Sequence, residues 1–367
     1  MTKAVYTNTP MPRAKWKQVL ELVLRELADG TLAHGAQFYT LEQLCARYHV
    51  SDITGRRVFS ELKARGLIAS KGRRGTTVIG QAVTQDVFMC LPNIYFENGS
   101  SGVSRYHSFQ RLFEGFGSDN YAQLFRVLPI PLAFLQENLA TFADKHVIIS
   151  AEALVDFTQQ PSVLNTALIA QLRDSVNPIV FDSYGDIPGI TQVGVHFALG
   201  IRKAVSHLVR RGHTRIGLFT GDVNDFWLQP RFTGFVEGMF AEGMRFDPSL
   251  LLMTTDLERE KNIPAIHEYL SRPQRPTAIV CTSDSRALFV LEYCRARGIA
   301  IPDALAVTGF DNIPEASLVW APLTTVDGME VQIGRKTLEL LVARRQDKLK
   351  EPCEVTIEPE LITRVSG

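Results

Sequence analysis

The sequence predicts an α/β protein in two parts: a small helical head that ends in a β-hairpin, and a larger body of parallel sheets covered by helices. Three observations support this fold class. Basic and acidic residues are unevenly distributed along the 367 residues. The first segment shows helical periodicity, and from Val87 onward short apolar runs alternate with helical segments. We therefore expect the head at residues 1–80, a linker at 81–86 and the body at 87–367.

The charge distribution indicates nucleic acid as a partner of the head. The whole chain has a net charge of zero, yet residues 1–80 hold 13 Lys and Arg against 6 Asp and Glu, a charge of +7. Residues 81–367 hold 26 against 33, a charge of −7. Basic clusters neutralise phosphates and gain free energy from counterion release. The other interpretation of such a cluster is a solvated surface, so the fold of the head matters as well as its charge.

Composition argues against several other classes of protein. Apolar residues make up 45% of the chain and charged residues 21%, a usual mixture for a globular protein. No apolar stretch approaches the ~18 residues that a transmembrane helix needs, and residues 1–18 lack the apolar core of a signal peptide. The five cysteines are widely spaced, which argues against a disulfide framework or a zinc site. We expect a cytoplasmic protein with no membrane association, cofactor or metal.

The head has the element order of a winged helix-turn-helix, which is three helices followed by a β-ribbon. Apolar residues recur at intervals of three and four in the first segment, as on one face of a helix. Thr40 and Gln43 can form a capping box at the second helix, and Ser51 can cap the third. Gly72 and Gly75 permit a tight turn between the strands. The expected helices are 16–27, 40–49 and 51–65, and the expected strands are 67–70 and 76–79.

The head also contains short motifs in a characteristic order. They are Asp29-Gly30-Thr31-Leu32, Gly35, Val50-Ser51, Leu62, Gly66-Leu67-Ile68 and Gly72-Arg73-Arg74-Gly75-Thr76. On these motifs, residues 13–80 resemble the GntR-type winged helix. Since the recognition helix of helix-turn-helix proteins enters the major groove with its N-terminal residues, the resemblance implies DNA contacts from the third helix and the wing tip. These contacts are Ser51, Thr54, Arg56, Arg73, Arg74 and Gly75.

Two positions of the head depart from the family pattern. Glu42 and Asp52 stand where the family usually has arginine, and both arginines are common phosphate contacts. Arg47 and Arg57 are cations that can replace them, and Arg57 is added to the expected DNA contacts. Charge, helix order and wing together predict double-stranded DNA as the partner of the head.

The body alternates strands and helices, which predicts parallel sheets with helices on both faces. Roughly 280 residues exceed one comfortable core, so two lobes are expected. Ligands of such sheets bind at the carboxyl ends of the strands, which face a cleft in a two-lobed body. A helix near 331–343 is expected to pack in the second lobe. The expected strands are 87–91, 124–128, 146–150, 178–181, 215–219, 278–281 and 305–309, and the expected helices are 107–117, 135–143, 162–175, 198–211, 231–243, 262–271 and 285–297.

Polar side chains follow several of these strands. Asp182, Asp225, Asp284 and Asp311 each come after a predicted strand, and carboxylates accept hydrogen bonds from ligand hydroxyls. An aromatic residue such as Trp227 can cover the face of a sugar. A lone Asp at a strand end is also a common helix cap, and we assign Asp311 to the crossover between the lobes rather than to the pocket.

The body carries a second set of ordered motifs, strongest from Pro178 onward. They are Ala204-x-x-His207-Leu208-x-x-x-Gly212-His213-x-x-Ile216, Arg231-x-x-Gly234-Phe235, Pro276-Thr277-Ala278-Ile279, Ser283-Asp284-x-x-Ala287, Gly298-Ile299-x-Ile301-Pro302-Asp303, Val307-x-Gly309-Phe310-Asp311 and Pro322-Leu323-Thr324-Thr325-Val326. On these motifs, the body resembles the LacI/GalR-type effector-binding domain, which is similar in fold to type I periplasmic binding proteins. The resemblance implies that Arg231 binds effector oxygens and that Asp284 accepts from effector hydroxyls. The candidate effector contacts are Tyr106, Asp182, Asp225, Trp227, Arg231, Asp256 and Asp284.

The head and body together resemble the arabinose-repressor class of bacterial regulators. The resemblance implies a repressor that binds a pseudo-palindromic operator as a homodimer, with a small molecule, expected to be a sugar, altering its DNA affinity. A solute-binding protein of a transporter is the main alternative, and the basic head and absent signal peptide argue against it. An enzyme is disfavoured because the sequence contains no nucleophile elbow, phosphate-binding loop or metal-ligand cluster.

Overall fold

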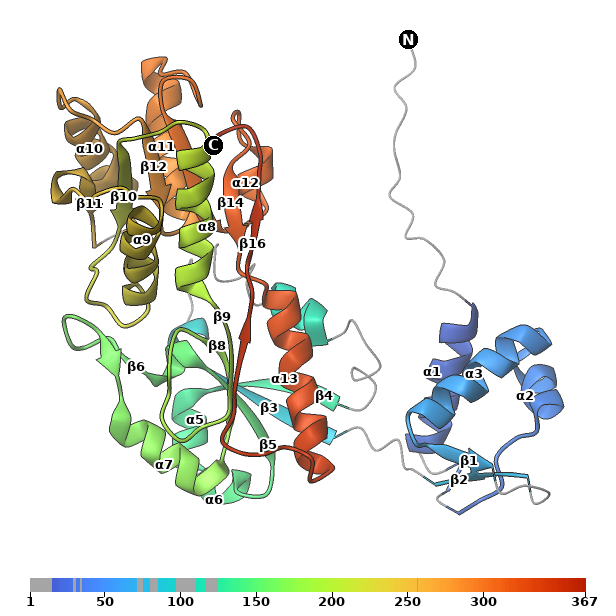
Figure 1. Cartoon of the computed structure of the whole chain (residues 1–367). Helices are drawn as coiled ribbons and strands as arrows, with labels where there is room; N and C mark the ends of the chain where they lie inside the picture. The colour runs from blue at the N-terminus through green and yellow to red at the C-terminus, as the bar shows by residue number, and fades with distance from the viewer. Residues whose placement is uncertain are drawn as a thin grey trace, which may run out of the picture. The chain divides into compact units, whose positions relative to one another are not determined.

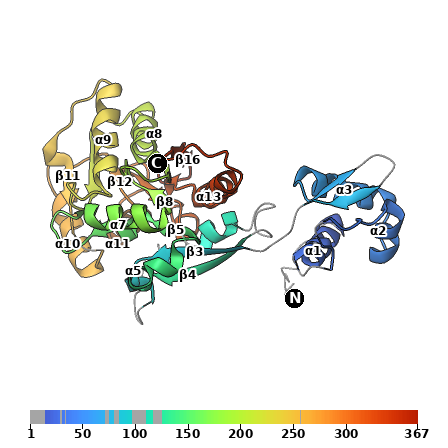
Figure 2. The same cartoon turned by 90° about the horizontal axis from the view of Figure 1, so that it is seen from below.

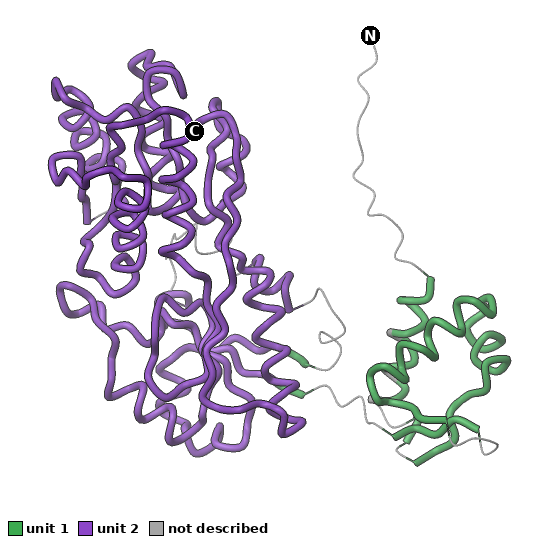
Figure 3. Tube along the Cα trace, in the orientation of Figure 1, with its two compact units in different colours: residues 1–86, 122–126 green, residues 87–121, 127–367 purple. Residues whose placement is uncertain are grey.

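The structure is a computed structural model that describes residues 15–28, 31–33, 35–70, 75–79, 85–96, 110–116, 125–255 and 257–367. The chain forms two compact units (Figure 3). One consists of residues 1–86 and 122–126 and contains the head; the other consists of residues 87–121 and 127–367 and contains the body. Most of the expected linker lies outside the described residues.

In the described part of the head, three helices precede a two-stranded antiparallel ribbon, which is the predicted order (Figure 1). The helices are α1 (Lys15–Ala28), α2 (Leu41–Tyr48) and α3 (Asp52–Ala64), and the strands are β1 (Ile68–Ser70) and β2 (Thr76–Val78). The three helices share one apolar core, in which Val23, Leu44, Val58 and Leu62 are fully buried. The expected winged helix-turn-helix is therefore confirmed.

Side-chain caps define where α2 and α3 begin. The Gln43 N–H donates to the Thr40 hydroxyl, and the Thr40 N–H donates to the Gln43 side chain, which completes the expected capping box. The Ser51 hydroxyl accepts from the Thr54 N–H at the start of α3. At Gly55 a Cβ would lie 2.6 Å from a side chain of α2. The missing side chain therefore lets α3 pack closely on α2.

The first lobe of the body contains a sheet in the order β15-β9-β8-β5-β3-β4. The pairs that join β15, β9, β8, β5 and β3 are parallel. Apolar residues of α7 pack on this sheet, with Leu172, Ile149 and Val180 fully buried in the shared core. The strands are β3 (Gln85–Leu91), β4 (Phe125–Pro131), β5 (His146–Ser150), β8 (Ile179–Ser183), β9 (Gln192–Val195) and β15 (Glu354–Ile357), and the helices are α5 (Leu132–Glu137), α6 (Leu139–Phe142), α7 (Thr166–Val176) and α13 (Glu330–Arg345).

The second lobe contains a sheet in the order β11-β10-β12-β13-β14-β16, parallel except for the pair of β14 and β16. Because side chains alternate along a strand, Val280 of β12 packs with α8 and α9, whereas Ile279 packs with α10 and α11. Helices α8 and α9 lie side by side in both views (Figures 1 and 2). The strands are β10 (Ile216–Thr220), β11 (Leu251–Met253), β12 (Ala278–Cys281), β13 (Ala306–Asp311), β14 (Thr324–Asp327) and β16 (Glu360–Ile362), and the helices are α8 (Phe197–Arg210), α9 (Gln229–Ala241), α10 (Arg259–Leu270), α11 (Asp284–Arg297) and α12 (Glu315–Leu318).

The chain passes from one lobe to the other after β9, β14 and β15, as far as the described residues show. The passage after β14 brings α13 to the first lobe, where it packs against β8 and β9. The expectation that this helix packs in the second lobe is therefore wrong, because an apolar helical pattern does not specify which sheet it covers. The expected helix at 135–143 is two short helices, α5 and α6, interrupted at Asn138.

Among the described residues, no helix combines the length and the apolar content that crossing a membrane requires. No group of His, Cys, Asp and Glu side chains in the same residues is arranged to hold a metal ion.

Candidate functional site

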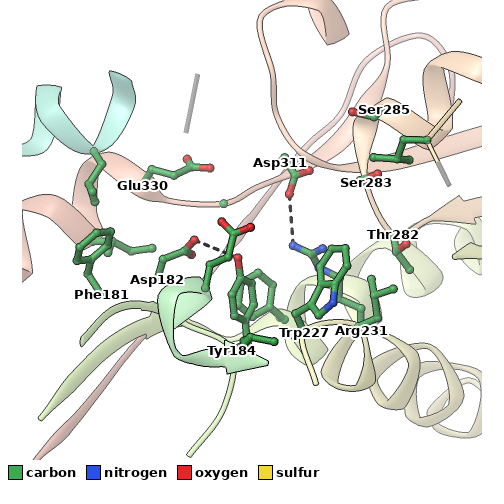
Figure 4. A pocket seen from close by; sticks show the side chains of 18 of the residues that line it. Phe181, Asp182, Tyr184, Trp227, Arg231, Thr282, Ser283, Ser285, Asp311 and Glu330 are labelled. Atoms are coloured by element: carbon green, nitrogen blue, oxygen red, sulfur yellow. Dashed lines mark hydrogen bonds and ion pairs between the residues drawn. The ribbon is translucent and has the colours of Figure 1, made fainter. Parts of the chain in front are cut away.

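A cavity lies between the two lobes of the body, where β8, β12 and β13 end. Its volume is about 150 Å³, which is room for a small molecule rather than a single water. The first lobe contributes Phe181, Asp182 and Tyr184 to the wall, and the second contributes Trp227 and Arg231 (Figure 4). Open α/β sheets bind ligands at the carboxyl ends of their strands, so this cavity is the candidate ligand site.

Arg231 projects into the cavity from the first turn of α9, just after Pro230. Its guanidinium lies 4.7 Å from the ring centres of both Phe197 and Phe310, and 3.4 Å from the Asp311 carboxylate (Figure 4). The side chain is 7% exposed, and its Nε has no hydrogen-bond partner among the described residues. Two ring contacts and an ion pair hold the guanidinium in place, while its Nε stays available to a ligand.

Three carboxyl groups with raised pKa values share the cavity with Arg231. Burial is the largest cause of a raised pKa in each of them, to about 6 for Asp182, about 7 for Asp311 and about 8 for Glu330. Arg231 opposes the rise in the pKa of Asp182 and Asp311, whereas the charge of Asp182 adds to the rise in the other two. Near neutral pH the cavity therefore offers both protonated carboxyl groups, which donate, and carboxylates, which accept.

The backbone around the cavity takes conformations that are rare for residues other than glycine. The φ angle is 55° at Asp182, 108° at Asp311 and 50° at Asn312. Such conformations cost roughly 1–3 kcal/mol each and cluster at functional sites. Asp327 supports this region, because its carboxylate accepts from Asn312 Nδ2 at 2.7 Å and from Arg111 at 2.8 and 2.9 Å. The strained backbone is therefore evidence, independent of the shape of the cavity, that this is a functional site.

Three of the expected effector contacts line the cavity, namely Asp182, Trp227 and Arg231. The indole Nε1 of Trp227 is buried and has no hydrogen-bond partner among the residues described. Tyr106 and Asp256 lie outside the described residues. Ligand contact by any of these side chains stays a prediction.

The other two expected effector contacts, Asp225 and Asp284, do not line the cavity, and their contact with an effector stays an untested prediction. Asp284 is fully buried, and its carboxylate accepts from the Thr325 hydroxyl at 2.5 Å and the Ile313 N–H at 2.9 Å. Asp225 accepts from the N–H and the hydroxyl of Ser162, in the first lobe, at 2.8 and 2.7 Å. Asp284 therefore joins α11 to β14, and Asp225 joins the two lobes.

The sequence interpretation also missed four charged residues that line the cavity: Glu152, Arg286, Asp311 and Glu330. Asp311 carried a usable signal, since it follows a predicted strand as Asp182 does. Glu330 follows β14, a segment that was not expected to be a strand. Arg286 lies inside a predicted helix, where a charged residue does not by itself indicate a ligand site. Whether Arg286 and Glu330 face the cavity depends on the rotation of their helices, and that rotation is set by packing.

Asp182→Asn is expected to reduce the loss of stability that the protein shows as pH rises from about 4 to about 6. The pKa of Asp182 is raised from 3.8 to about 6, so over this range the folded state keeps a proton that the unfolded chain has lost. The free energy of unfolding therefore falls with rising pH through this group. Asparagine also tolerates the φ of 55° at this position.

Thermal unfolding between pH 4 and pH 7 measures this effect. The exposed Asp174, whose pKa is lowered by a hydrogen bond from Arg173, provides the control variant Asp174→Asn. Melting temperatures of Asp182→Asn that run parallel to those of the original protein across this range would contradict the prediction.

The N-terminal part of α3 is the candidate DNA-binding surface. The Ser51 hydroxyl lies 3.1 Å from that of Thr54. Arg56 donates to Asp52 at 2.9 and 3.1 Å, and the two side chains are 70% and 59% exposed. Exposed ion pairs contribute only ~0–1 kcal/mol, so Arg56 can exchange Asp52 for a phosphate at little cost.

The two cations expected to compensate for the missing arginines are held within the head. Arg47 forms an ion pair with Glu26 and lies over the ring of Tyr39. The guanidinium of Arg57 lies 4.8 Å from the ring centre of Trp16. Arg57 has no acidic partner among the described residues, which makes it the better candidate for a phosphate contact.

The wing is described only in part. Gly75 lies just before β2 with a φ of 86°, which favours glycine. Arg73 and Arg74, the expected contacts at the wing tip, lie outside the described residues. DNA contacts from the wing stay a prediction.

Two family models match the chain. Residues 15–78 match bacterial regulatory proteins of the gntR family, and residues 205–366 match a periplasmic binding protein-like domain. Residues 15–78 are therefore similar to a gntR-type winged helix, and residues 205–366 to a periplasmic binding protein-like domain. Both resemblances inferred from the sequence are thereby confirmed.

Curated relatives of the chain are described as HTH-type transcriptional repressor PurR. The one from Aliivibrio fischeri (strain MJ11) is 30% identical over 209 residues, which are 56% of this chain and 62% of the relative. The one from Aliivibrio salmonicida is 28% identical over 207 residues, with the same two shares. The chain spans about three fifths of the length of these relatives.

Solved structures share the fold of the periplasmic-binding-protein-like body. A transcriptional regulator CelR–cellobiose complex matches with a TM-score of 0.62 and 22% identity, covering 90% of this chain and 100% of that one. A LacI-family regulatory protein from Chloroflexus aggregans matches with a TM-score of 0.63 and 22% identity, covering 77% and 98%. A LacI-family regulator from Enterococcus faecium with bound ribose matches with a TM-score of 0.60 and 21% identity, covering 77% and 98%. These likenesses confirm the two-lobed α/β fold.

Proposed function

We propose that this protein is a ligand-responsive transcription repressor. The observation that supports this function best is a cavity between the lobes of a body that is joined to a gntR-type winged helix. The relatives and structural neighbours are described as repressors and LacI-family regulators, which favours regulation over catalysis. DNA as a partner implies that the protein acts in the cytoplasm.

In the proposed mechanism, a homodimer binds two half-sites with one recognition helix each. A small molecule in the cavity contacts both lobes and therefore favours one arrangement of the lobes over another. The lobes already meet beside the cavity, where the Phe226 N–H donates to the Ser162 carbonyl at 3.1 Å and Ser162 donates to Asp225. Two structural neighbours were solved with cellobiose and with ribose, which supports a sugar as the ligand.

The test combines DNA binding with ligand screening. DNA that is enriched from a random library by the full chain is used in a fluorescence anisotropy assay, and sugars that raise the melting temperature of the protein are then added. The expected result is a ligand-dependent change in DNA affinity and a steep dependence of that affinity on salt. A chain that lacks residues 1–84 is expected to bind the sugar but not the DNA. Absence of enriched DNA, or DNA binding by the shortened chain, would contradict the proposed function.

Asp52→Asn is expected to tighten DNA binding by about 3–10-fold at low salt. The slope of the logarithm of the binding constant against the logarithm of the salt concentration should become steeper by about one per half-site. The substitution removes a negative charge beside the backbone of DNA and frees Arg56 from its exposed ion pair. Anisotropy titrations at several salt concentrations measure both effects. In the matched control, Asp52→Asn is introduced into the Arg56→Ala variant, and the gain in DNA affinity relative to Arg56→Ala alone should disappear. An equal gain in the presence and absence of Arg56 would show that Arg56 does not contact phosphate.

A further inference from the structure

Among the residues that the structure describes, Arg286 is a buried cation without an acidic partner. It lines the cavity from the first turn of α11 and is 4% exposed. Its Nη1 donates to the Thr254 hydroxyl at 2.7 Å, and its guanidinium lies 5.3 Å from the ring centre of Phe219. No carboxylate of the described residues forms an ion pair with it, in contrast to Arg231, which pairs with Asp311.

The charge of Arg286 is retained in spite of this burial. Burial is the main cause that lowers the pKa of Arg286 to about 10, and the nearby charge of Arg231 contributes to the lowering. The guanidinium is therefore protonated at neutral pH, and two like charges face one cavity. A buried charge that lacks a partner destabilises a protein. A negative group bound between these two arginines would relieve both the burial cost and their mutual repulsion.

Other groups on the same wall are suited to an anion. Thr282, Ser283 and Ser285 line the cavity at the N-terminus of α11 (Figure 4), where the helix dipole favours negative charge. Ser283 caps the helix by accepting from the Arg286 N–H. The carboxylate of Asp284 does not oppose an anion there, because it is turned to Thr325 and Ile313.

The opposite side of the cavity has a different chemistry. Asp182 and Glu330 lie on the side of the first lobe, and Asp311 lies between them and Arg231 (Figure 4). Within the described ranges the Asp182 carboxyl has one hydrogen-bond partner, the Tyr184 hydroxyl at 3.2 Å, so it has free acceptor capacity. Carboxylates take hydroxyl donors well and repel anions. A ligand that fits both sides therefore has hydroxyl groups at one end and a negative charge at the other.

We infer that the cavity binds a polyhydroxylated ligand that carries one anionic group, a carboxylate or a phosphate, and that Arg286 with the N-terminus of α11 binds this anionic group. The inference rests on the proposed ligand-responsive function and narrows its ligand from a neutral sugar to an acidic one. Arg231 lies between the two ends of the ligand and contacts both.

The first experiment measures thermal unfolding of the full chain in a phosphate-free buffer at constant ionic strength. Arg286→Met keeps an unbranched, flexible side chain and removes the unpaired charge, so its melting temperature is expected to lie about 2–4 °C above that of the original protein. Arg295→Met removes an exposed charge from the same helix and is the matched control, with no expected change. Inorganic phosphate is then added, and it should stabilise the original protein and Arg295→Met but not Arg286→Met.

The second experiment compares acidic sugars with their neutral counterparts, namely glucuronate with glucose, galacturonate with galactose, and glucose 6-phosphate with glucose. At least one acidic member is expected to raise the melting temperature more than its neutral counterpart, and Arg286→Met should lose the difference. Arg286→Lys, which keeps the charge, should retain part of it. The inference is overturned if phosphate and the acidic sugars leave the original protein unchanged, or if they stabilise Arg286→Met equally. The inference is also overturned if a neutral sugar changes DNA affinity and its acidic counterpart does not. That result would leave the proposed regulatory function intact.

Discussion

Arg231→Met is expected to weaken ligand binding by about 100-fold or more and to remove the effect of ligand on DNA affinity. Hydrogen bonds to charged groups contribute roughly 1.5–3 kcal/mol each, and a factor of ten corresponds to about 1.4 kcal/mol, so the loss of two such bonds accounts for this change. Methionine can still pack against Phe197 and Phe310, beside which the guanidinium now lies. The effect should therefore arise from lost recognition rather than from a disturbed fold.

The measurement is isothermal titration with any sugar that raises the melting temperature of the protein, followed by DNA binding with and without that sugar. Arg210→Met removes an exposed arginine of the same lobe and should behave like the original protein. Arg231→Lys should bind weakly, because a lysine cannot offer the planar fork that lies over two rings. An Arg231→Met variant that keeps full ligand affinity would show that the cavity is not the ligand site.

Much of the head was predictable because its structure is set by local interactions. The capping box of Thr40 and Gln43 and the cap at Ser51 are visible in the sequence, and the structure contains both. Side-chain pairing was not predictable in the same way. Arg47 has a suitable position for a phosphate contact, yet it binds Glu26 on another helix, and only the fold shows that pairing.

Cavity residues at the ends of strands could be predicted from the sequence, whereas those on helices could not. Asp182 lies at the end of β8, where any parallel sheet presents its residues to a cleft, and it lines the cavity as expected. Asp284 and Arg286 lie in one helical turn, and the rotation of α11 decides which of them faces the cavity. The structure turns Asp284 toward Thr325 and leaves Arg286 on the cavity wall. That rotation comes from the packing of α11 in the core, which depends on residues far away in the sequence.

Gly234→Ala is expected to destabilise the body by about 3 kcal/mol, as overpacking of a close contact does. A Cβ at Gly234 would lie 2.3 Å from the carbonyl oxygen of Ala198 and 2.5 Å from its Cα. Both atoms belong to the backbone of α8, so the clash cannot be relieved by a side-chain rotation. The helices α8 and α9 must move apart, and urea or thermal unfolding measures the resulting loss in the free energy of unfolding.

Gly238→Ala, one turn further along α9, is the matched control. Its Cβ would lie 3.1 Å from Val205 Cβ, a contact that a shift of a few tenths of an ångström relieves, and alanine gains about 1 kcal/mol in helix propensity over glycine. Its stability should therefore change little. The same comparison tests how the ligand site is built, because Arg231 lies on α9 and Phe197 on α8. Gly234→Ala should weaken ligand binding more than Gly238→Ala does, even at a temperature where both are folded. Equal affinities in the two variants would show that the close packing of α8 on α9 stabilises the body without positioning Arg231.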